Sequence, residues 1–177
     1  MADPARIVEA AKLLAAAKYP MIVAGGGVHL SGAHEVLADL QESASLPVAT
    51  TSMGKGAVAE THALSLGVIG YFMGTRGMAR HLRELVDRAD CVLFVGDRTN
   101  QNGTDSWTLF PKSARYFHID VDSLEVGRNY EALRLVGDAK VTLQALSDAM
   151  ACLTSQRGER LAGKWSKKSP SEKNVSS

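Results

Sequence analysis

Three adjacent glycines near the start of the chain are the first residues whose type could support ligand binding. Gly25, Gly26 and Gly27 directly follow the apolar run 21–24. Glycines let a backbone approach a pyrophosphate closely, and the start of a following helix would add free N–H groups and a positive dipole end. The strict dinucleotide fingerprint Gly-x-Gly-x-x-Gly is missing, because the next glycine is Gly32. A plain tight turn is therefore an equally good explanation for the three glycines.

Polar residues at the ends of later apolar runs could complete such a site. Thr51, Ser52 and Met53 begin a loop that offers hydroxyls and backbone N–H groups to a phosphate or a ribose. Arg98 follows the clearest apolar run, and its guanidinium can clamp a phosphate or stack on a flat ring. A salt bridge within the loop is nearly as reasonable for this arginine. Asp120 ends another run, at the position where a carboxylate accepts hydrogen bonds from ribose hydroxyls.

Other residues of reactive type have ordinary structural explanations. Asp122 and Asp138 fit as caps of the turn and the helix that follow them, and Lys55 fits as a solvated surface lysine. None of the five histidines has metal-ligand spacing to a cysteine or a carboxylate, so no metal site is expected. The Gly-x-Ser-x-Gly elbow of a serine hydrolase is missing as well.

Short apolar runs alternate with helical periodicities, and these predict the elements that position the candidate residues. Asp3 and Pro4 are a capping carboxylate and a first-turn proline, which predicts a helix over 3–18. Ser31 is expected to cap a second helix, a third is expected over 77–88, and Asp138 is expected to cap the last. Strands are expected at 21–24, 46–51, 64–69, 91–95, 115–119 and 133–136.

This alternation predicts an α/β fold, a three-layer open parallel sheet of about six strands with helices on both faces. The carboxyl ends of parallel strands share one edge, where such sheets bind ligands. One domain is expected over residues 1–153. Residues 154–177 are expected to form a linker-like or disordered tail, because this stretch ends in polar sequence without apolar anchors.

Composition excludes several classes of partner. The 177 residues carry a formal net charge of +1 and are 45% hydrophobic, so no strong field recruits nucleic acid or an anionic membrane. No signal peptide and no apolar run of membrane-spanning length is found. Cys91 and Cys152 are expected to be reduced core residues. These features predict a soluble, cytoplasmic protein with no nucleic-acid or membrane partner.

The candidate segments, taken in order, resemble the central domain of thiamine-diphosphate-dependent enzymes of the acetolactate synthase and pyruvate oxidase superfamily. The resemblance covers about residues 3–153, and its most specific part is Asp120-Val121-Asp122 with the following Glu-Val-Gly-Arg-Asn. The segments that carry it are 19–27, 46–51, 54–56, 66–67, 89–98, 118–122, 125–129 and 137–138.

This resemblance implies a sheet of the DHS-like NAD/FAD-binding type and a ligand that varies within the superfamily. Acetolactate synthase-like members bind FAD with no redox role in carboligation, oxalyl-CoA decarboxylase-like members bind ADP, and others bind neither. The residues that would contact FAD by position are Gly25, Gly26, Gly27, Thr51, Ser52, Met53, Leu66, Gly67, Gly96, Arg98, Asp120, Val121, Asp138 and Ala139.

Two departures from the acetolactate synthase pattern bear on that ligand. Residues 67–70 lack the usual histidine, and residues 99–102 lack a second arginine, so a pyrophosphate would lose one partner. The sequence therefore leaves FAD, ADP and an empty site open.

By the same resemblance, the chain is the central domain of a carboligase or 2-keto acid decarboxylase, has no catalytic residues and is inactive alone. Thiamine diphosphate and magnesium would be held by the pyrimidine- and pyrophosphate-binding domains of the parent enzyme, a homodimer or homotetramer. The chain would then be an excised middle domain or a truncated product. The alternatives are a free-standing FAD- or ADP-binding module and, much less favoured, a sirtuin-like deacylase. The sirtuin-like alternative is disfavoured because the chain has only two cysteines and because residues 100–102 do not match the sirtuin pattern.

Overall fold

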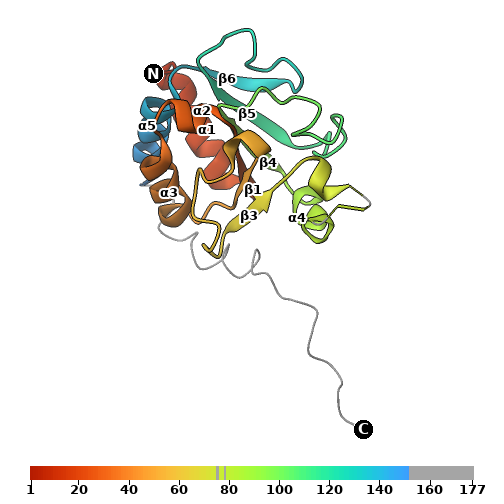
Figure 1. Cartoon of the computed structure of the whole chain (residues 1–177). Helices are drawn as coiled ribbons and strands as arrows, with labels where there is room; N and C mark the ends of the chain where they lie inside the picture. The colour runs from red at the N-terminus through yellow and green to blue at the C-terminus, as the bar shows by residue number, and fades with distance from the viewer. Residues whose placement is uncertain (75, 78, 152–177) are drawn as a thin grey trace.

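The computed structural model describes residues 1–74, 76–77 and 79–151, and it contains one parallel sheet of six strands in the order β3-β2-β1-β4-β5-β6 (Figure 1). The predicted α/β fold class is confirmed, and each expected strand is present. The strands are β1 (Pro20–Ala24), β2 (Val48–Thr50), β3 (Ser65–Val68), β4 (Cys91–Val95), β5 (Arg115–Asp120) and β6 (Ala132–Val136).

The register of the sheet brings the predicted ligand loops to one edge. β1 and β4 lie at its centre, and every residue of both strands is buried, as expected for parallel strands covered on two faces. Ala24 pairs with Thr50 on one side and with Val95 on the other, so these three strands end together. The loops that follow them, and those after β5 and β6, therefore meet at the carboxyl edge.

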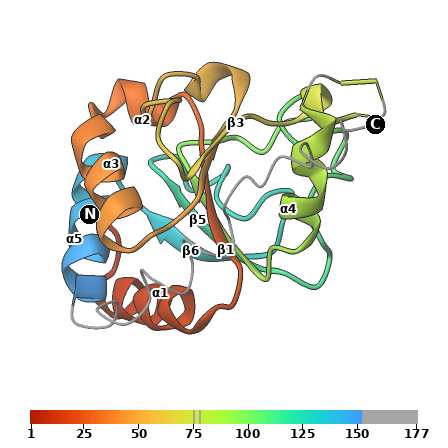
Figure 2. The same cartoon turned by 90° about the horizontal axis from the view of Figure 1, so that it is seen from below.

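Three long helices cover one face of this sheet: α1 (Pro4–Ala16), α3 (His34–Ser43) and α5 (Ala139–Ala151) (Figure 2). α1 begins as predicted, because Oδ1 of Asp3 accepts a hydrogen bond from the N–H of Ala5 at 2.9 Å. The core on this face is almost entirely aliphatic. Its most deeply buried side chains include Leu14, Ile22, Leu37, Leu40, Leu93, Leu143 and Leu146.

The helix expected to begin after Ser31 starts later. A four-residue helix, α2 (Gly27–Leu30), comes first, and the Ser31 hydroxyl donates to the carbonyl of Gly27 at 2.9 Å. α3 then begins at His34, with Ala33 at its N-cap. The prediction of Ser31 as cap of the second helix was therefore wrong, because its hydroxyl bonds back to the preceding turn.

The opposite face carries short elements and loops. The helix expected over 77–88 is reduced to the 3₁₀ turn η3 (Arg80–Leu82) and to α4 (Arg83–Asp87). Before η3, Gly77 packs on the Phe72 carbonyl oxygen, which would lie 2.0 Å from a Cβ at this position, and the N–H of Ala79 donates to the same carbonyl at 2.9 Å. The chain therefore folds back on the turn η2 (Tyr71–Met73) where the hydrophobic periodicity alone predicts a helix.

Aromatic rings build the core of this second face. The Phe94 ring stacks on Tyr116 with centroids 5.8 Å apart, meets Phe110 edge-on at 5.2 Å, and lies 5.4 Å from Tyr130. The imidazole of His118 meets the same ring edge-on at 5.7 Å. One phenylalanine of the central strand β4 therefore organises the packing of the loops around it.

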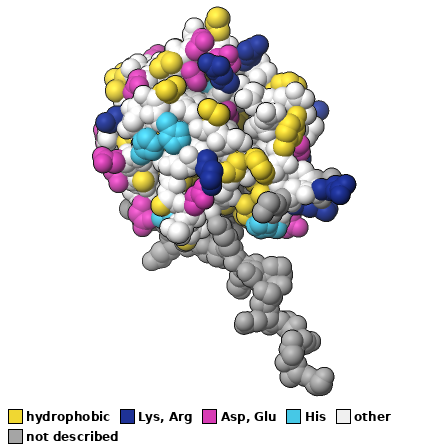
Figure 3. Space-filling model, in the orientation of Figure 1, with side chains coloured by type: hydrophobic (Ala, Val, Ile, Leu, Met, Phe, Trp, Pro, Cys, Tyr) yellow, Lys and Arg dark blue, Asp and Glu magenta, His cyan; other side chains and the backbone are white. Residues whose placement is uncertain are grey.

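The surface matches the modest charge of the sequence. In the view of Figure 3, acidic, basic and hydrophobic side chains are interspersed without a large area of one sign. Across the described part of the chain, no helix is both long and apolar enough to cross a membrane. Cys91 is buried in β4, whereas Cys152 and the predicted tail 154–177 lie outside the described residues.

Candidate functional site

A cleft of about 430 Å³ opens at the carboxyl edge, among the loops that follow β1, β4, β5 and β6. This volume lies in the range typical of small-molecule sites. The structure thus brings together seven of the predicted contact residues: Gly27, Gly96, Arg98, Asp120, Val121, Asp138 and Ala139. Leu30, Ser31 and Asp122 also line the cleft but were not among the predicted contacts.

The glycines of the first loop have a sufficient structural explanation. A Cβ on Gly25 would lie 2.3 Å from the carbonyl oxygen of Gly96, and one on Gly27 would lie 2.5 Å from the Gly96 Cα. The N–H of Gly27 already donates to the Gly96 carbonyl at 2.9 Å. These residues are therefore glycine because two backbone loops touch here, and the four-residue α2 does not supply the helix start expected from the sequence.

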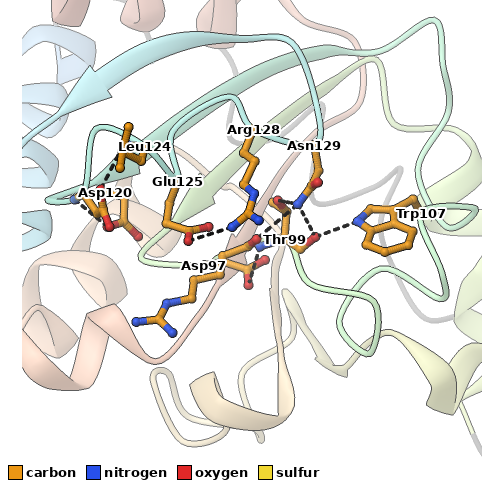
Figure 4. Close-up of polar contacts among 10 residues, drawn as sticks. Asp97, Thr99, Trp107, Asp120, Leu124, Glu125, Arg128 and Asn129 are labelled. Atoms are coloured by element: carbon orange, nitrogen blue, oxygen red, sulfur yellow. Dashed lines mark hydrogen bonds and ion pairs between the residues drawn. The ribbon is translucent and has the colours of Figure 1, made fainter.

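Aspartates dominate the polar rim of the cleft. Oδ1 of Asp120 accepts from the N–H of Asp122, and Oδ1 of Asp122 accepts from the N–H of Leu124, each at 2.9 Å (Figure 4). Oδ1 of Asp138 accepts from the N–H of Val141 at 3.0 Å, so the predicted capping roles of Asp122 and Asp138 are confirmed. Each of these hydrogen bonds uses Oδ1, and Oδ2 of the same carboxylate can accept a hydrogen bond from a ligand hydroxyl.

Positive character in the cleft comes from two sources. Arg98 is exposed, and among the described residues it forms no ion pair, so the alternative of a salt bridge within its loop is not found there. α5 begins at Ala139 on the cleft wall. The first turn of a helix has N–H groups without intrahelical partners and the positive end of the helix dipole, both of which favour an anion.

The remaining predicted residues lie beside this cleft, at the ends of β2 and β3. Thr51 accepts from the N–H of Gly54 at 3.2 Å and begins the turn η1 (Ser52–Gly54), in which Met53 is 74% exposed. A Cβ on Gly26 would lie 3.3 Å from the Met53 Cβ, so η1 adjoins the glycine loop. Gly67 lies near the end of β3 with φ +75°.

Two further residues at this edge have ordinary structural roles. Leu66 is buried in the core of the second face, so only its backbone is available to a ligand. The Nζ of Lys55 forms an ion pair with Glu60, as expected for a surface lysine.

A buried carboxyl group that sequence reasoning missed lies directly behind the cleft. Asp97 follows Gly96 and is only 5% exposed, and its Oδ1 accepts from the N–H of Thr99 at 3.2 Å. Its Oδ2 has no hydrogen-bond partner among the described residues. Burial raises the pKa of Asp97 to about 6, with a further upward contribution from the nearby charge of Asp120.

Two other buried polar side chains accompany Asp97. Nδ1 of His118 accepts from the N–H of Gly127 at 3.2 Å, while its Nε2 and the hydroxyl of Tyr130 are buried, close to the Asp97 backbone and to Thr104 respectively. Burial lowers the pKa of His118 and raises that of Tyr130 to about 12. The sequence did not predict their burial, because polar side chains within or beside a strand are usually exposed.

The long loop after β4 is fixed at Thr99, whose φ of +48° is unusual for a residue with a branched side chain. The Asn129 amide donates to the carbonyl and the hydroxyl of Thr99, each at 3.0 Å. Trp107 Nε1 donates to the same carbonyl at 3.0 Å, and Figure 4 shows both side chains converging on it. This loop is thus held by a hydrogen bond from its own Trp107 and by hydrogen bonds from Asn129, which lies between β5 and β6, and it positions the neighbouring Arg98.

Comparison with known proteins gives a consistent result. Residues 7–146 match the family described as "Thiamine pyrophosphate enzyme, central domain". The chain is 42% identical to a probable acetolactate synthase large subunit of Methanococcus aeolicus over 142 residues, which is 80% of this chain and 23% of that protein. It is 33% identical to a 3D-(3,5/4)-trihydroxycyclohexane-1,2-dione hydrolase of Listeria monocytogenes, covering 88% of this chain and 24% of that protein.

A solved structure shares the fold. It belongs to a protein from Mycobacterium smegmatis assigned as a thiamin diphosphate-dependent enzyme, with a TM-score of 0.70 and 22% identity. The match covers 88% of this chain and 29% of that one. The chain thus spans about a quarter of the length of the curated relatives that it matches.

Proposed function

Because this chain belongs to the central-domain family of thiamine pyrophosphate enzymes, we propose that it serves such an enzyme as a nucleotide-binding, non-catalytic domain. The proposed ligand is ADP or the adenosine diphosphate half of FAD. The observation that carries this proposal is the single cleft shared by Arg98, Asp120 and the first turn of α5.

The cleft residues suit the parts of such a ligand. Asp120 and Asp122 would accept hydrogen bonds from the ribose hydroxyls. Leu30 and Val121, which are 92% and 70% exposed, would pack against the faces of the base. Arg98 and the first turn of α5 would bind phosphate oxygens.

The same residues fit an ADP unit better than the rest of a flavin nucleotide. The residues that line the cleft follow β1, β4, β5 and β6, and none of them follows β2 or β3. In FAD, the second half would extend toward Thr51, Ser52, Met53 and Gly67 at the ends of β2 and β3. FAD bound there would serve as a structural ligand, as in the acetolactate synthase-like members.

We further propose that the parent enzyme carries out a carboligation or a 2-keto acid decarboxylation of the acetolactate synthase type. Its thiamine diphosphate and magnesium would be held by pyrimidine- and pyrophosphate-binding domains, in a homodimer or homotetramer. A synthase and a hydrolase match this chain over a similar share of their lengths, which supports a central domain that does not itself select the reaction. Release of carbon dioxide from pyruvate by this chain with thiamine diphosphate and magnesium alone would contradict the non-catalytic role.

Binding of ADP and of FAD to the purified chain, measured by isothermal titration calorimetry, tests the nucleotide proposal. Arg98→Ala and Asp120→Ala should each weaken binding roughly tenfold or more, because each removes a charged hydrogen-bonding partner. Asp39→Asn changes an exposed carboxylate on α3, away from the cleft, and should leave the affinity unchanged. Failure of both nucleotides to bind, or equal binding by all variants, would overturn the proposal.

A further inference from the structure

Asp97 stands out because it is a buried acid that none of the contacts proposed for the ligand uses. Its neighbours in the chain, Gly96 and Arg98, both line the cleft, while its own side chain points into the protein and is 5% exposed. Oδ1 is held by the N–H of Thr99, but Oδ2 lacks a hydrogen-bond partner among the described residues. An ionised carboxylate in that position has little solvation and incomplete hydrogen bonding, both of which disfavour its charge.

The groups around Asp97 do not neutralise this charge. β5 contributes Asp120, whose negative charge further disfavours ionisation, and His118, whose own charge is disfavoured by burial. The segment before β6 contributes the phenol of Tyr130, and the loop after β1 contributes only backbone, at Gly25. Arg98 is the adjacent cation, but its side chain is exposed at the cleft.

We propose that Asp97 is a proton-binding site coupled to the cleft, so that an anion bound between Arg98 and the first turn of α5 drives uptake of one proton by the Asp97 carboxylate. The inference rests on the proposed function, because it requires a phosphate-bearing ligand in the cleft. The proton comes from solvent and adds to a carboxylate oxygen, and no other bond forms or breaks.

The coupling follows from the placement of the two negative charges. The pKa of Asp97 is already about 6, chiefly because the group is buried. A phosphate against Gly96 and Arg98 would engage the nearest cation and add a negative charge close by, which raises the pKa of Asp97 further. Binding of the anion and binding of the proton then favour each other, so affinity must fall as pH rises through the pKa values of the free and bound states.

ADP-ribose and adenosine are the probes that isolate this effect. The phosphates of ADP-ribose are esterified at both ends and keep their charge from pH 5 to 8, whereas ADP itself titrates in that range. The dissociation constant of ADP-ribose should rise with pH over about 5.5–7.5, by at most about tenfold per unit, the limit for one proton. Uncharged adenosine should bind without this pH dependence.

Two variants and a direct measurement of proton uptake test this coupling. Asp97→Asn should bind ADP-ribose with an affinity that no longer changes with pH, while Asp39→Asn should behave as the unchanged protein does. Calorimetry of the unchanged protein at pH 6.5, in two buffers of different ionisation enthalpy, should show net proton uptake when ADP-ribose binds. This measurement does not depend on whether Asp97→Asn folds. Binding without proton uptake, or pH dependence that persists in Asp97→Asn, would overturn the coupling and leave the proposed function intact. Absence of any nucleotide binding would overturn both.

Discussion

The two faces of the sheet are covered by different elements and different types of side chain. One is covered by α1, α3 and α5 over an aliphatic core, and the other by short turns and a long loop over clustered aromatic rings. The buried polar groups of Asp97, His118 and Tyr130 gather beside the aromatic face. Regular helices thus cover the sheet on one side, while on the other single side chains shape the loops beside the cleft.

The largest expected effect comes from removing the ring that organises the aromatic face. Phe94→Ala should destabilise the protein by about 3–5 kcal/mol, because Phe94 is fully buried and packs against Phe110, Tyr116 and Tyr130. Leu37→Ala on the aliphatic face should cost about 2–5 kcal/mol. Urea unfolding of both variants measures the difference, and a cost below about 1 kcal/mol for Phe94→Ala would show that the aromatic face is not tightly packed.

The next effect concerns the charge buried beside that face. The pKa of Asp97 is raised from 3.8 to about 6, so between these values the folded state holds a proton that the unfolded state has released. Its contribution to stability therefore decreases as pH rises from about 4 to 6, by about 3 kcal/mol in total, and is constant above that window.

Asp97→Asn isolates this contribution, because the amide keeps an oxygen for the N–H of Thr99 and carries no charge. As pH rises from about 4 to 6, the variant should gain stability relative to the unchanged protein. Chemical unfolding at several pH values, without ligand, measures this difference. Asp39→Asn, on the aliphatic side, should show no such trend, and parallel curves for all three proteins would contradict a buried charge at Asp97.

The same contrast explains what the sequence could predict. The strands, α1 and α5 follow from apolar runs, from the cap at Asp3 and from the cap at Asp138, which are local signals. The ordered segments also placed Arg98 and Asp120 correctly at the same edge, because parallel strands must end together.

What the sequence could not predict depends on contacts that hydrophobic periodicity does not encode. Gly77 packs on the carbonyl of Phe72, five residues earlier, where the periodicity predicts the start of the third helix. Asp97 is buried with the backbone of Gly25, in the loop after β1, against it, and nothing in its sequence neighbours marks that burial. Tertiary packing overrides local propensity at these positions.

A smaller effect is expected from the hydrogen bonds that fix the long loop. Asn129→Ala removes the amide that donates to the carbonyl and the hydroxyl of Thr99, and should cost about 1–2 kcal/mol. Trp107→Phe keeps a ring but removes the third donor to Thr99, and should cost about 1 kcal/mol. Thermal unfolding measures both, and additive losses in the double variant would mean that the two donors hold Thr99 independently.

The smallest effect is expected at an exposed ion pair. The side chains of Lys55 and Glu60 are 59% and 49% exposed, so solvent screens their attraction, and breaking the pair should change stability by less than about 0.5 kcal/mol. Arg83 and Asp105 are only 29% and 22% exposed, at an N–O distance of 2.8 Å, and hold the long loop against α4. Double-mutant cycles on the two pairs should therefore give a larger coupling for Arg83 and Asp105. Equal couplings would mean that this ion pair adds nothing to the order of the aromatic face, which would then rest on ring packing and on the donors to Thr99 alone.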